Sequence, residues 1–285
     1  MRIAVIGSGI SGLASAYLLH PHADVHIFER DSRVGGHSHT VDADFNAVKV
    51  PVDTGFIVFN PLNYPNLVSM FERLDVPWID TNMSFAVSLR EGGCEYEGSL
   101  AGLLAQPGNL LRPRYWSMVS DLVRFYRKGY SRAHSGPTDE SLAEFLRREG
   151  YGTALTEDHL LPMAAAIWSC SARTMLDYPV RSFLQFMENH KLLNFIDRPQ
   201  WRTVKGGSRE YVKRLIDTLG GIDGGRVHLN TNITGIWRDQ GGVILSIEGQ
   251  GDVWFDKVVM AAHADQSLAM ITDATVLERD ILSSF

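Results

Sequence analysis

The chain has 285 residues, a length that allows a large buried core and more than one domain. Hydrophobic residues make up 45% of it and charged residues 21%, as in an ordinary soluble globular protein. The formal net charge of −6 gives no electrostatic reason to expect nucleic acid as a partner. These bulk properties do not determine the oligomeric state.

The two cysteines, Cys94 and Cys170, lie far apart and form no C-x-x-C pair. They are therefore expected to be free thiols in a reducing compartment. The N-terminus shows no signal peptide, and no run approaches the ~18 apolar residues of a membrane span. The sequence predicts a cytoplasmic protein without a transmembrane segment, and it leaves peripheral membrane contact open.

The N-terminal residues follow the order strand, glycine turn, helix, strand and acid. Ile3–Ile6 are predicted to form a strand buried on both faces, and Ile10–Leu19 a helix. Asp24–Phe28 form a second apolar strand with Glu29 at its carboxyl end. This order is typical of the first βαβ unit of a dinucleotide-binding fold.

Three glycines between the first strand and the helix fill the places of G-x-G-x-x-G. Gly7 permits the tight turn, Gly9 lets the backbone approach a pyrophosphate, and Gly12 lets the helix pack on the strand. The N–H groups at the helix start have no intrahelical partners, so a diphosphate suits them. A carboxylate at position 29 would accept hydrogen bonds from ribose hydroxyls. The motif predicts an adenine dinucleotide without choosing NAD or FAD, with contacts from Gly7, Gly9, Ile10, Ser11, Gly12, Glu29 and Arg30.

The next segment carries a resemblance to a known family. Arg33, Gly35, Gly36, His37 and Thr40 resemble the R-x-G-G-R-x-x-T extension of flavin-containing amine oxidases and their relatives, which include phytoene-type desaturases. The resemblance implies that FAD is the cofactor and that this segment lies along its pyrophosphate and flavin. His37 stands where many members of that superfamily carry arginine, so the fixed positive charge of that position is replaced.

A second stretch, Val52–Phe56, resembles the D-x-G segment of the same superfamily. The resemblance implies that the backbone of Thr54, Gly55 and Phe56 passes close to the isoalloxazine ring. The pair His37 and His39 also has an alternative interpretation as a metal site, since imidazole is a common ligand. No cysteine or acidic cluster stands beside this H-x-H pair, so no metal is expected.

The middle of the chain is predicted to be mainly helical and aromatic. Tyr64–Leu74 read as a helix, Met83–Leu89 and Cys94–Tyr96 as a hairpin, and Gly102–Pro113 as a loop or broken helix. In the helix Arg114–Tyr130, an apolar stripe is expected to face the core: Trp116, Val119, Leu122, Val123 and Tyr126. Further helices are expected at Leu142–Leu146, His159–Ser171 and Phe183–Leu193.

The chain then returns to α/β character. Ser208 is a plausible N-cap for a helix over Arg209–Leu219. Short strands follow at Arg226–Leu229, Ile233–Arg238, Val243–Glu248, Val253–Phe255 and Lys257–Ala262. The resemblance makes these the second half of the FAD domain, with Ile233 near adenine and Ala262 near the ADP portion. His263 has an equally good interpretation as a satisfied histidine at the strand end.

We therefore expect an α/β fold, a Rossmann-like FAD-binding domain of parallel sheet plus small β-meander with an inserted, mainly helical substrate domain. The FAD-binding domain is predicted over 1–74 and 204–265, the insert over 75–203, and a return to the substrate domain over 266–285. A helix is predicted from Ala264 to the end at Phe285, where relatives usually continue. A fragment, a truncated gene product and a naturally short variant all stay open, and the flavin is expected to be noncovalent.

No catalytic triad, carboxylate pair or H-E-x-x-H motif is present, and the catalytic residues stay unassigned. Flavin oxidases need none, because the cofactor accepts the hydride and the protein positions the substrate. The absence of a Y-x-x-x-K pair argues against a short-chain NAD dehydrogenase, and a pure NAD-binding module remains a further alternative. Candidate substrate contacts come from the insert, although core packing is the favoured role for each: Trp168, Tyr178, Phe186, Asn189 and His190.

The predicted function is FAD-dependent oxidation of a C–N or C–C bond in a small, apolar molecule by hydride transfer. The aromatic insert also favours an alternative, the desaturation or isomerisation of a lipid or isoprenoid. A dinucleotide-binding fragment without turnover is the third interpretation.

Overall fold

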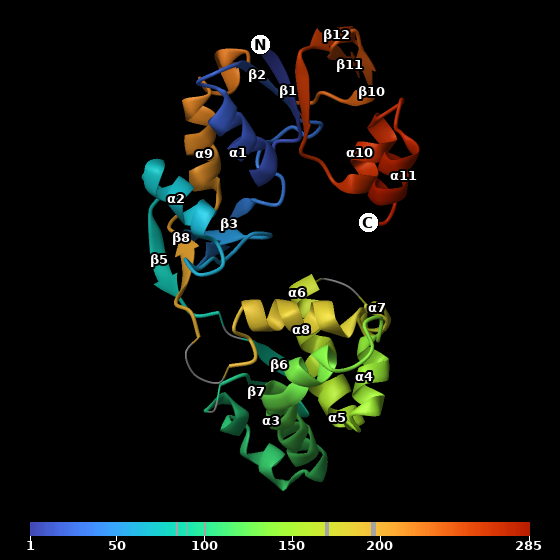
Figure 1. The fold of residues 1–285 in the computed structure, drawn as a ribbon. Helices are drawn as coiled ribbons and strands as arrows, with labels where there is room; N and C mark the ends of the chain where they lie inside the picture. The colour runs from blue at the N-terminus through green and yellow to red at the C-terminus, as the bar shows by residue number, and fades with distance from the viewer. Residues whose placement is uncertain (84, 90, 100, 169–170, 195–197) are drawn as a thin grey trace. The chain divides into compact units, whose positions relative to one another are not determined.

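The computed structural model describes residues 1–83, 85–89, 91–99, 101–168, 171–194 and 198–285. The chain forms two compact units (Figure 1), which are treated separately below. The first unit comprises Met1–Phe59, Pro65–Asp80 and Arg202–Phe285, and the second comprises Asn60–Tyr64 and Thr81–Trp201. The sequence placed the corresponding boundaries at 74/75 and 203/204. Within the described residues, no helix combines the length and apolarity that crossing a membrane requires.

A four-stranded parallel sheet forms the centre of the first unit, in the order β13-β1-β2-β9. The apolar residues of its central strands, Ile3–Ile6, Val25, Ile27 and Phe28, are buried because both faces of a parallel sheet are covered. The helices α1 and α9 pack against each other beside this sheet (Figure 1). The elements are β1 (Arg2–Ile6), α1 (Ile10–Leu19), β2 (Asp24–Phe28), α9 (Arg209–Thr218), β9 (Val227–His228) and β13 (Lys257–Met260).

An antiparallel meander packs on this sheet through one apolar cluster. It consists of β10 (Ile233–Asp239), β11 (Gly242–Ile247) and β12 (Gly251–Phe255), in sequential order. Leu245 and Phe255 of the meander are fully buried against Ala4 and Phe28 of the parallel strands. The predicted strands of this region are thus present, and the expectation of a parallel sheet plus small meander is confirmed.

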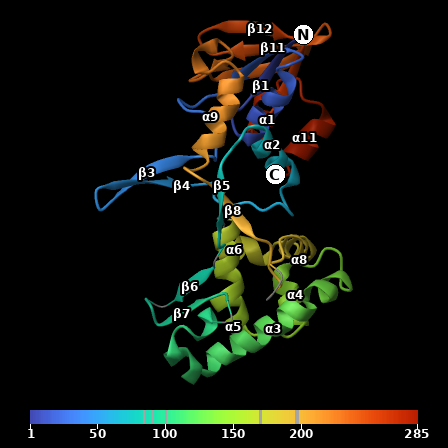
Figure 2. The same cartoon turned by 90° about the vertical axis from the view of Figure 1, so that its left-hand side faces the viewer.

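The first unit also holds a hairpin that the sequence did not predict. β3 (Thr40–Phe45) and β4 (Val48–Asp53) pair across the two-residue turn Asn46-Ala47, whose φ angles are 49° and 65°. Such a turn matches the twist of the strands it joins. The hairpin extends away from α9 in Figure 2. Next along the chain come α2 (Pro65–Arg73) and β5 (Trp78–Thr81), and β5 pairs with β8 (Trp201–Val204).

The second unit is mainly helical and has its own aromatic core, in which Phe125, Phe145 and Phe183 are fully buried. The hairpin of β6 (Ala86–Leu89) and β7 (Cys94–Glu97) packs beside it, and two short 3-10 helices occupy the predicted broken segment. The helices are α3 (Pro113–His134), α4 (Leu142–Arg148), α5 (Thr153–Leu155), α6 (Leu161–Trp168), α7 (Ala172–Leu176) and α8 (Val180–Asn189), with a π-helical turn over Thr156–Leu160.

The buried face of α3 lies about one residue away from the face that the sequence predicted. Tyr115, Met118 and Phe125 face the core together with Leu122. Trp116 is 49% exposed, and its indole N–H donates to the Leu110 carbonyl oxygen at 2.8 Å. Apolar residues at neighbouring positions of this helix form two overlapping stripes. The stripe that contains Tyr115, Met118 and Phe125 is the one that packs in the core.

Two further expectations about helix termini are corrected. The predicted single helix from Ala264 is two helices, α10 (Ala264–Met270) and α11 (Val276–Leu282). Ile271 is extended, and the Thr272 N–H donates to the Ile236 carbonyl, so β10 takes the chain out of the helix. The hydroxyl of Ser208 does not cap α9. It donates to Asp53 Oδ1 at 2.8 Å instead.

Candidate cofactor site

The glycine turn after β1 is packed so tightly that two of its glycines admit no side chain. Gly7 has a φ of 102°, and a Cβ built on it would lie 2.7 Å from the Ala261 carbonyl oxygen. A Cβ on Gly12 would lie 1.9 Å from the carbonyl oxygen of Gly7. The turn, the start of α1 and the end of β13 are therefore held at backbone contact distance.

Gly9 differs from the other two glycines. A Cβ built on it would meet no atom within 4 Å, so its α-carbon faces open space. Gly9 is also the N-cap of α1, and no side chain caps this helix. Because the first turn carries no acid, the free N–H groups of Ile10, Ser11 and Gly12 present an uncompensated positive end. This is the arrangement that a diphosphate needs.

Glu29 is fixed against the glycine turn by Ser8, a residue that the sequence did not single out. Glu29 Oε2 accepts the Ser8 N–H at 2.9 Å and the Ser8 hydroxyl at 2.5 Å, and Oε1 accepts the Asp31 N–H at 2.9 Å. A carboxylate offers about four acceptor positions, so roughly one remains for a ribose hydroxyl. Ser8 is fully buried and occupies the variable place within G-x-G.

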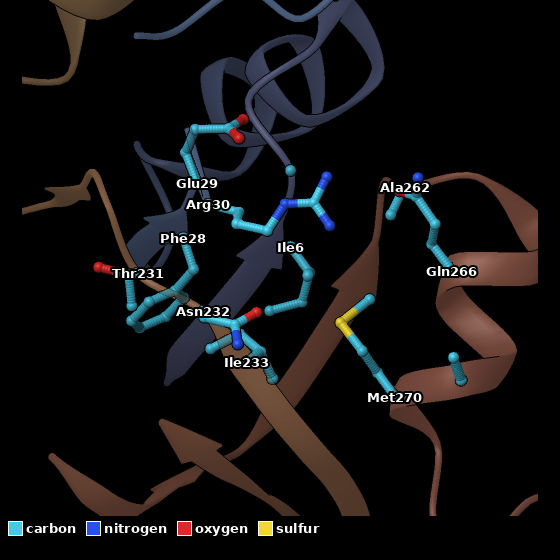
Figure 3. Close-up of a pocket in the computed structure, with 12 residues that line it drawn as sticks. Ile6, Phe28, Glu29, Arg30, Thr231, Asn232, Ile233, Ala262, Gln266 and Met270 are labelled. Carbon is cyan, nitrogen blue, oxygen red and sulfur yellow. The ribbon is translucent and has the colours of Figure 1, made fainter. Parts of the chain in front are cut away.

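A pocket of about 230 Å³ opens at the carboxyl ends of β1 and β2 (Figure 3). The side chain of Arg30 extends across it toward Ala262, while the Glu29 carboxylate lies at the end away from Ile233. Its volume suits one end of a dinucleotide better than a whole drug-sized ligand, for which pockets start near ~300 Å³. It is lined by Ile6, Gly7, Phe28, Glu29, Arg30, Thr231, Asn232, Ile233, Ala262, Gln266, Ala269 and Met270.

The structure thus brings five of the sequence-predicted cofactor residues to one pocket: Gly7, Glu29, Arg30, Ile233 and Ala262. Sequence reasoning missed the contribution of α10. Gln266 and Ala269 follow Ala262 at intervals of four and three, so they fall on one helix face. The helix predicted from Ala264 already contained both positions, so their spacing from Ala262 could have identified them.

The segment with Gly35 and Gly36 lies directly on the glycine turn. The Gly35 N–H donates to the Ser8 carbonyl oxygen at 3.0 Å, and a Cβ on Gly36 would lie 3.0 Å from Gly9 Cα. Arg33 is not directed into the first pocket. Its guanidinium donates to the Gly36 carbonyl oxygen at 2.9 Å and borders a separate cavity of about 660 Å³ beside α9.

The predicted D-x-G stretch packs on the same segment. The N–H of Thr54 donates to His39 O at 2.9 Å, and that of Phe56 to His37 O at 3.1 Å. A Cβ on Gly55 would lie 2.2 Å from the His37 carbonyl oxygen. Residues that the resemblance placed near the pyrophosphate and the flavin are therefore adjacent in the fold, around the start of α1.

The predicted substrate residues form one aromatic cluster in the second unit. The Trp168 ring lies 4.7 Å from Phe186 and 6.2 Å from Tyr178, measured between centroids, and His190 stacks on Phe186 at 4.1 Å. The backbone carbonyl of Asn189 accepts a hydrogen bond from Asn63 Nδ2 at 2.7 Å. The structure brings these residues together, and their role toward a substrate stays a prediction.

Residues 10–278 match the family model described as flavin containing amine oxidoreductase. The chain belongs to this family. The expectation of an amine-oxidase-like flavoprotein is confirmed, and with it the cofactor FAD. The sequence matches none of the curated proteins.

Solved structures of similar fold include two amine oxidases and a lipid enzyme. Putrescine oxidase bound to putrescine has a TM-score of 0.73 at 15% identity, covering 99% of this chain and 63% of that chain. Cyclohexylamine oxidase from Brevibacterium oxydans has a TM-score of 0.71 at 19% identity, with 99% and 62% covered. A fatty acid isomerase from P. acnes, described as CLA-producing, has a TM-score of 0.57 at 21% identity, with 99% and 63% covered. The chain thus spans less than two thirds of the length of these structures.

Proposed function

We propose that this chain is an FAD-dependent oxidoreductase that oxidises a C–N or C–C bond of a small, hydrophobic substrate. Hydride transfer to noncovalently bound FAD would be the chemical step, and this is the chemistry that the cofactor supplies. The observation that carries the proposal is the open side of Gly9 at the uncapped start of α1, next to a pocket at the strand ends.

Each part of the first unit has a separate task in this proposal. The N–H groups of the first turn of α1 would bind the diphosphate, and Glu29 and Arg30 would orient the adenosine ribose. Phe28, Ile233 and Met270 supply an apolar surface for adenine.

The substrate class rests on the aromatic cluster around Trp168. The Trp168 ring contacts three other uncharged rings, those of Tyr178, Phe183 and Phe186, which favours an apolar molecule. An amine is supported by the family description and by two of the structural neighbours. The fatty acid isomerase supports the second candidate, desaturation or isomerisation of a lipid or isoprenoid.

The test is reconstitution followed by anaerobic reduction. The purified chain is expected to bind FAD and to absorb near ~450 nm as a flavoprotein. Small apolar amines and unsaturated fatty acids are then added separately without oxygen, and bleaching by one class identifies the bond that is oxidised. A chain that binds FAD but is bleached by neither class would be a binding protein without turnover, and the oxidoreductase proposal would be wrong for it.

A further inference from the structure

Two histidines lie side by side at the junction of the segments that surround the glycine turn. The rings of His37 and His263 are stacked, with centroids 5.7 Å apart and planes inclined by 8°. His37 follows Gly36, and a Cβ built on Gly36 would lie 3.0 Å from Gly9 Cα. His263 follows shortly after Ala261, whose carbonyl oxygen would lie 2.7 Å from a Cβ built on Gly7. Both residues are exposed. The pair thus stands beside the uncapped end of α1.

The ring nitrogens of this pair are free to bind a ligand. Neither imidazole donates or accepts a hydrogen bond within the part of the chain that the structure describes. The other imidazole nearby, His39, already contacts the Thr54 hydroxyl through Nδ1 at 3.1 Å. A histidine pair without protein partners at a predicted diphosphate site therefore needs an explanation.

Several other charged groups on the surrounding segments are engaged in hydrogen bonds within the protein. Arg33 donates to Gly36, the carboxylate of Glu29 is held by Ser8, and Asp53 accepts from Ser208. The first turn of α1 has no acid, and that of α10 contributes Asp265. The Arg30 guanidinium, which is assigned above to the ribose, is the other cationic group beside the first pocket. The two imidazoles are then the groups that could add positive charge beside the diphosphate.

We propose that His37 and His263 together form a proton-dependent counter-charge for the FAD diphosphate, in place of a fixed guanidinium. This inference rests on the FAD site of the proposed function. Imidazole changes its charge between about pH 5 and pH 8. A diphosphate beside the pair would favour the charged form of an imidazole, because an opposite charge nearby stabilises that form.

The consequence is that FAD binding takes up protons. Affinity is highest where the imidazoles are protonated and decreases as the pH rises, by at most about tenfold per pH unit for each linked proton. A guanidinium at position 37 would remove most of this dependence, because it stays charged over the whole range.

The experiment is calorimetric titration with FAD at about pH 6 and about pH 8, each in two buffers of different ionisation enthalpy. The wild-type chain is expected to bind about tenfold or more weakly at the higher pH and to show net proton uptake. His37→Arg is expected to retain tight binding at both values, and the double variant His37→Gln with His263→Gln to bind weakly at both. His22→Gln, an exposed histidine on another segment, is the matched control and should behave as wild type.

The outcomes separate this inference from the proposed function. Binding of FAD with the same affinity and no proton uptake at both pH values overturns the role of the pair and leaves the FAD site intact. Failure to bind FAD at either pH overturns both. Thermal unfolding of every variant shows whether a loss of affinity has instead come from a loss of fold.

Discussion

Asp53 connects three segments of the first unit through one carboxylate. Oδ1 accepts hydrogen bonds from the Thr40 hydroxyl at 2.6 Å and from the Ser208 hydroxyl at 2.8 Å, and the Ser208 N–H donates at 2.9 Å. Ser208 is fully buried, so its donors have no access to water once the carboxylate is removed. Asp53 therefore holds together the end of β4, the start of β3 and the start of α9.

We expect Asp53→Ala to lower the free energy of unfolding by about 1–3 kcal/mol, the cost of leaving buried donors unpaired. Urea denaturation measures this difference. Asp44→Ala, an exposed acid on the same hairpin, is the control and should change stability by less than about 0.5 kcal/mol. Equal stabilities for Asp53→Ala and the wild type would show that the carboxylate does not organise these segments.

The residues around the glycine turn were the most predictable part of the site. Gly7 and Gly12 act through backbone sterics, and the same short contacts recur wherever a helix starts directly behind a buried strand. Ser8 and Gln266 were not predicted, since their roles depend on tertiary neighbours that lie far away in the sequence. Local sequence motifs therefore predict the glycine turn, whereas the residues that line the pocket are known only from the tertiary structure.

The π-helical turn over Thr156–Leu160 places His159 in the core of the second unit. The Tyr96 hydroxyl donates to the Asp158 carbonyl oxygen at 2.6 Å, so it accepts from His159 Nδ1 at 3.0 Å. His159 Nε2 then accepts from the Tyr126 hydroxyl at 3.3 Å, which requires a neutral ring. Burial lowers the pKa of His159 to about 4.

The second unit should therefore lose stability in acid. Above the ordinary histidine pKa near ~6.5, His159 is neutral in both the folded and the unfolded chain, so its burial costs nothing. Below that pH the unfolded chain takes up a proton that the folded protein does not, so the free energy of unfolding decreases as the pH falls toward about 4. The loss is on the order of 3 kcal/mol at the lower value. Circular dichroism melts at a series of pH values measure it. The His159→Gln variant should show a weaker dependence of stability on pH, and the control His22→Gln, at an exposed position, should behave as the wild type. If the pH dependence is the same in His159→Gln as in the wild type, His159 is not its source.

The capping box of α11 explains why the chain makes two helices where one was predicted. The Thr275 hydroxyl accepts the Glu278 N–H at 3.2 Å, and the Glu278 carboxylate accepts the Thr275 N–H at 2.8 Å. The pattern was visible in the sequence as Thr-x-x-Glu. The extended backbone before it was not, because β10 imposes it through Ile236.

Thr275→Ala is expected to destabilise α11 by about 1 kcal/mol, the usual cost of losing a threonine N-cap. Hydrogen exchange of the amides in Val276–Leu282 should become about fivefold faster, while exchange in α1 stays unchanged. Protection equal to wild type in α11 would mean that packing, and not the cap, holds this helix. Ser283→Ala at the opposite end serves as the control.

At the scale of the whole molecule, the order of elements predicted most of the fold. A βαβ unit, a helical middle and a return to strands correspond to the parallel sheet with meander and to the separate helical unit. No element was predicted between Thr40 and Val52, although the valines there alternate with Asp42, Asp44 and Lys49, a pattern typical of a strand. The buried face of α3 escaped prediction because two stripes fit equally well until the core around Phe125 selected one.

The central claim is that the open side of Gly9 receives the FAD diphosphate, and a fluorescence titration of Gly9→Ala with FAD tests it most directly. Because an added Cβ meets no protein atom there, this variant should unfold like the wild type, as should Gly108→Ala, the control glycine with equally open surroundings. Gly9→Ala is expected to bind FAD about tenfold or more weakly, since it separates the diphosphate from charge-assisted N–H donors worth about 1.5–3 kcal/mol each. Wild-type affinity in a correctly folded Gly9→Ala would contradict the account.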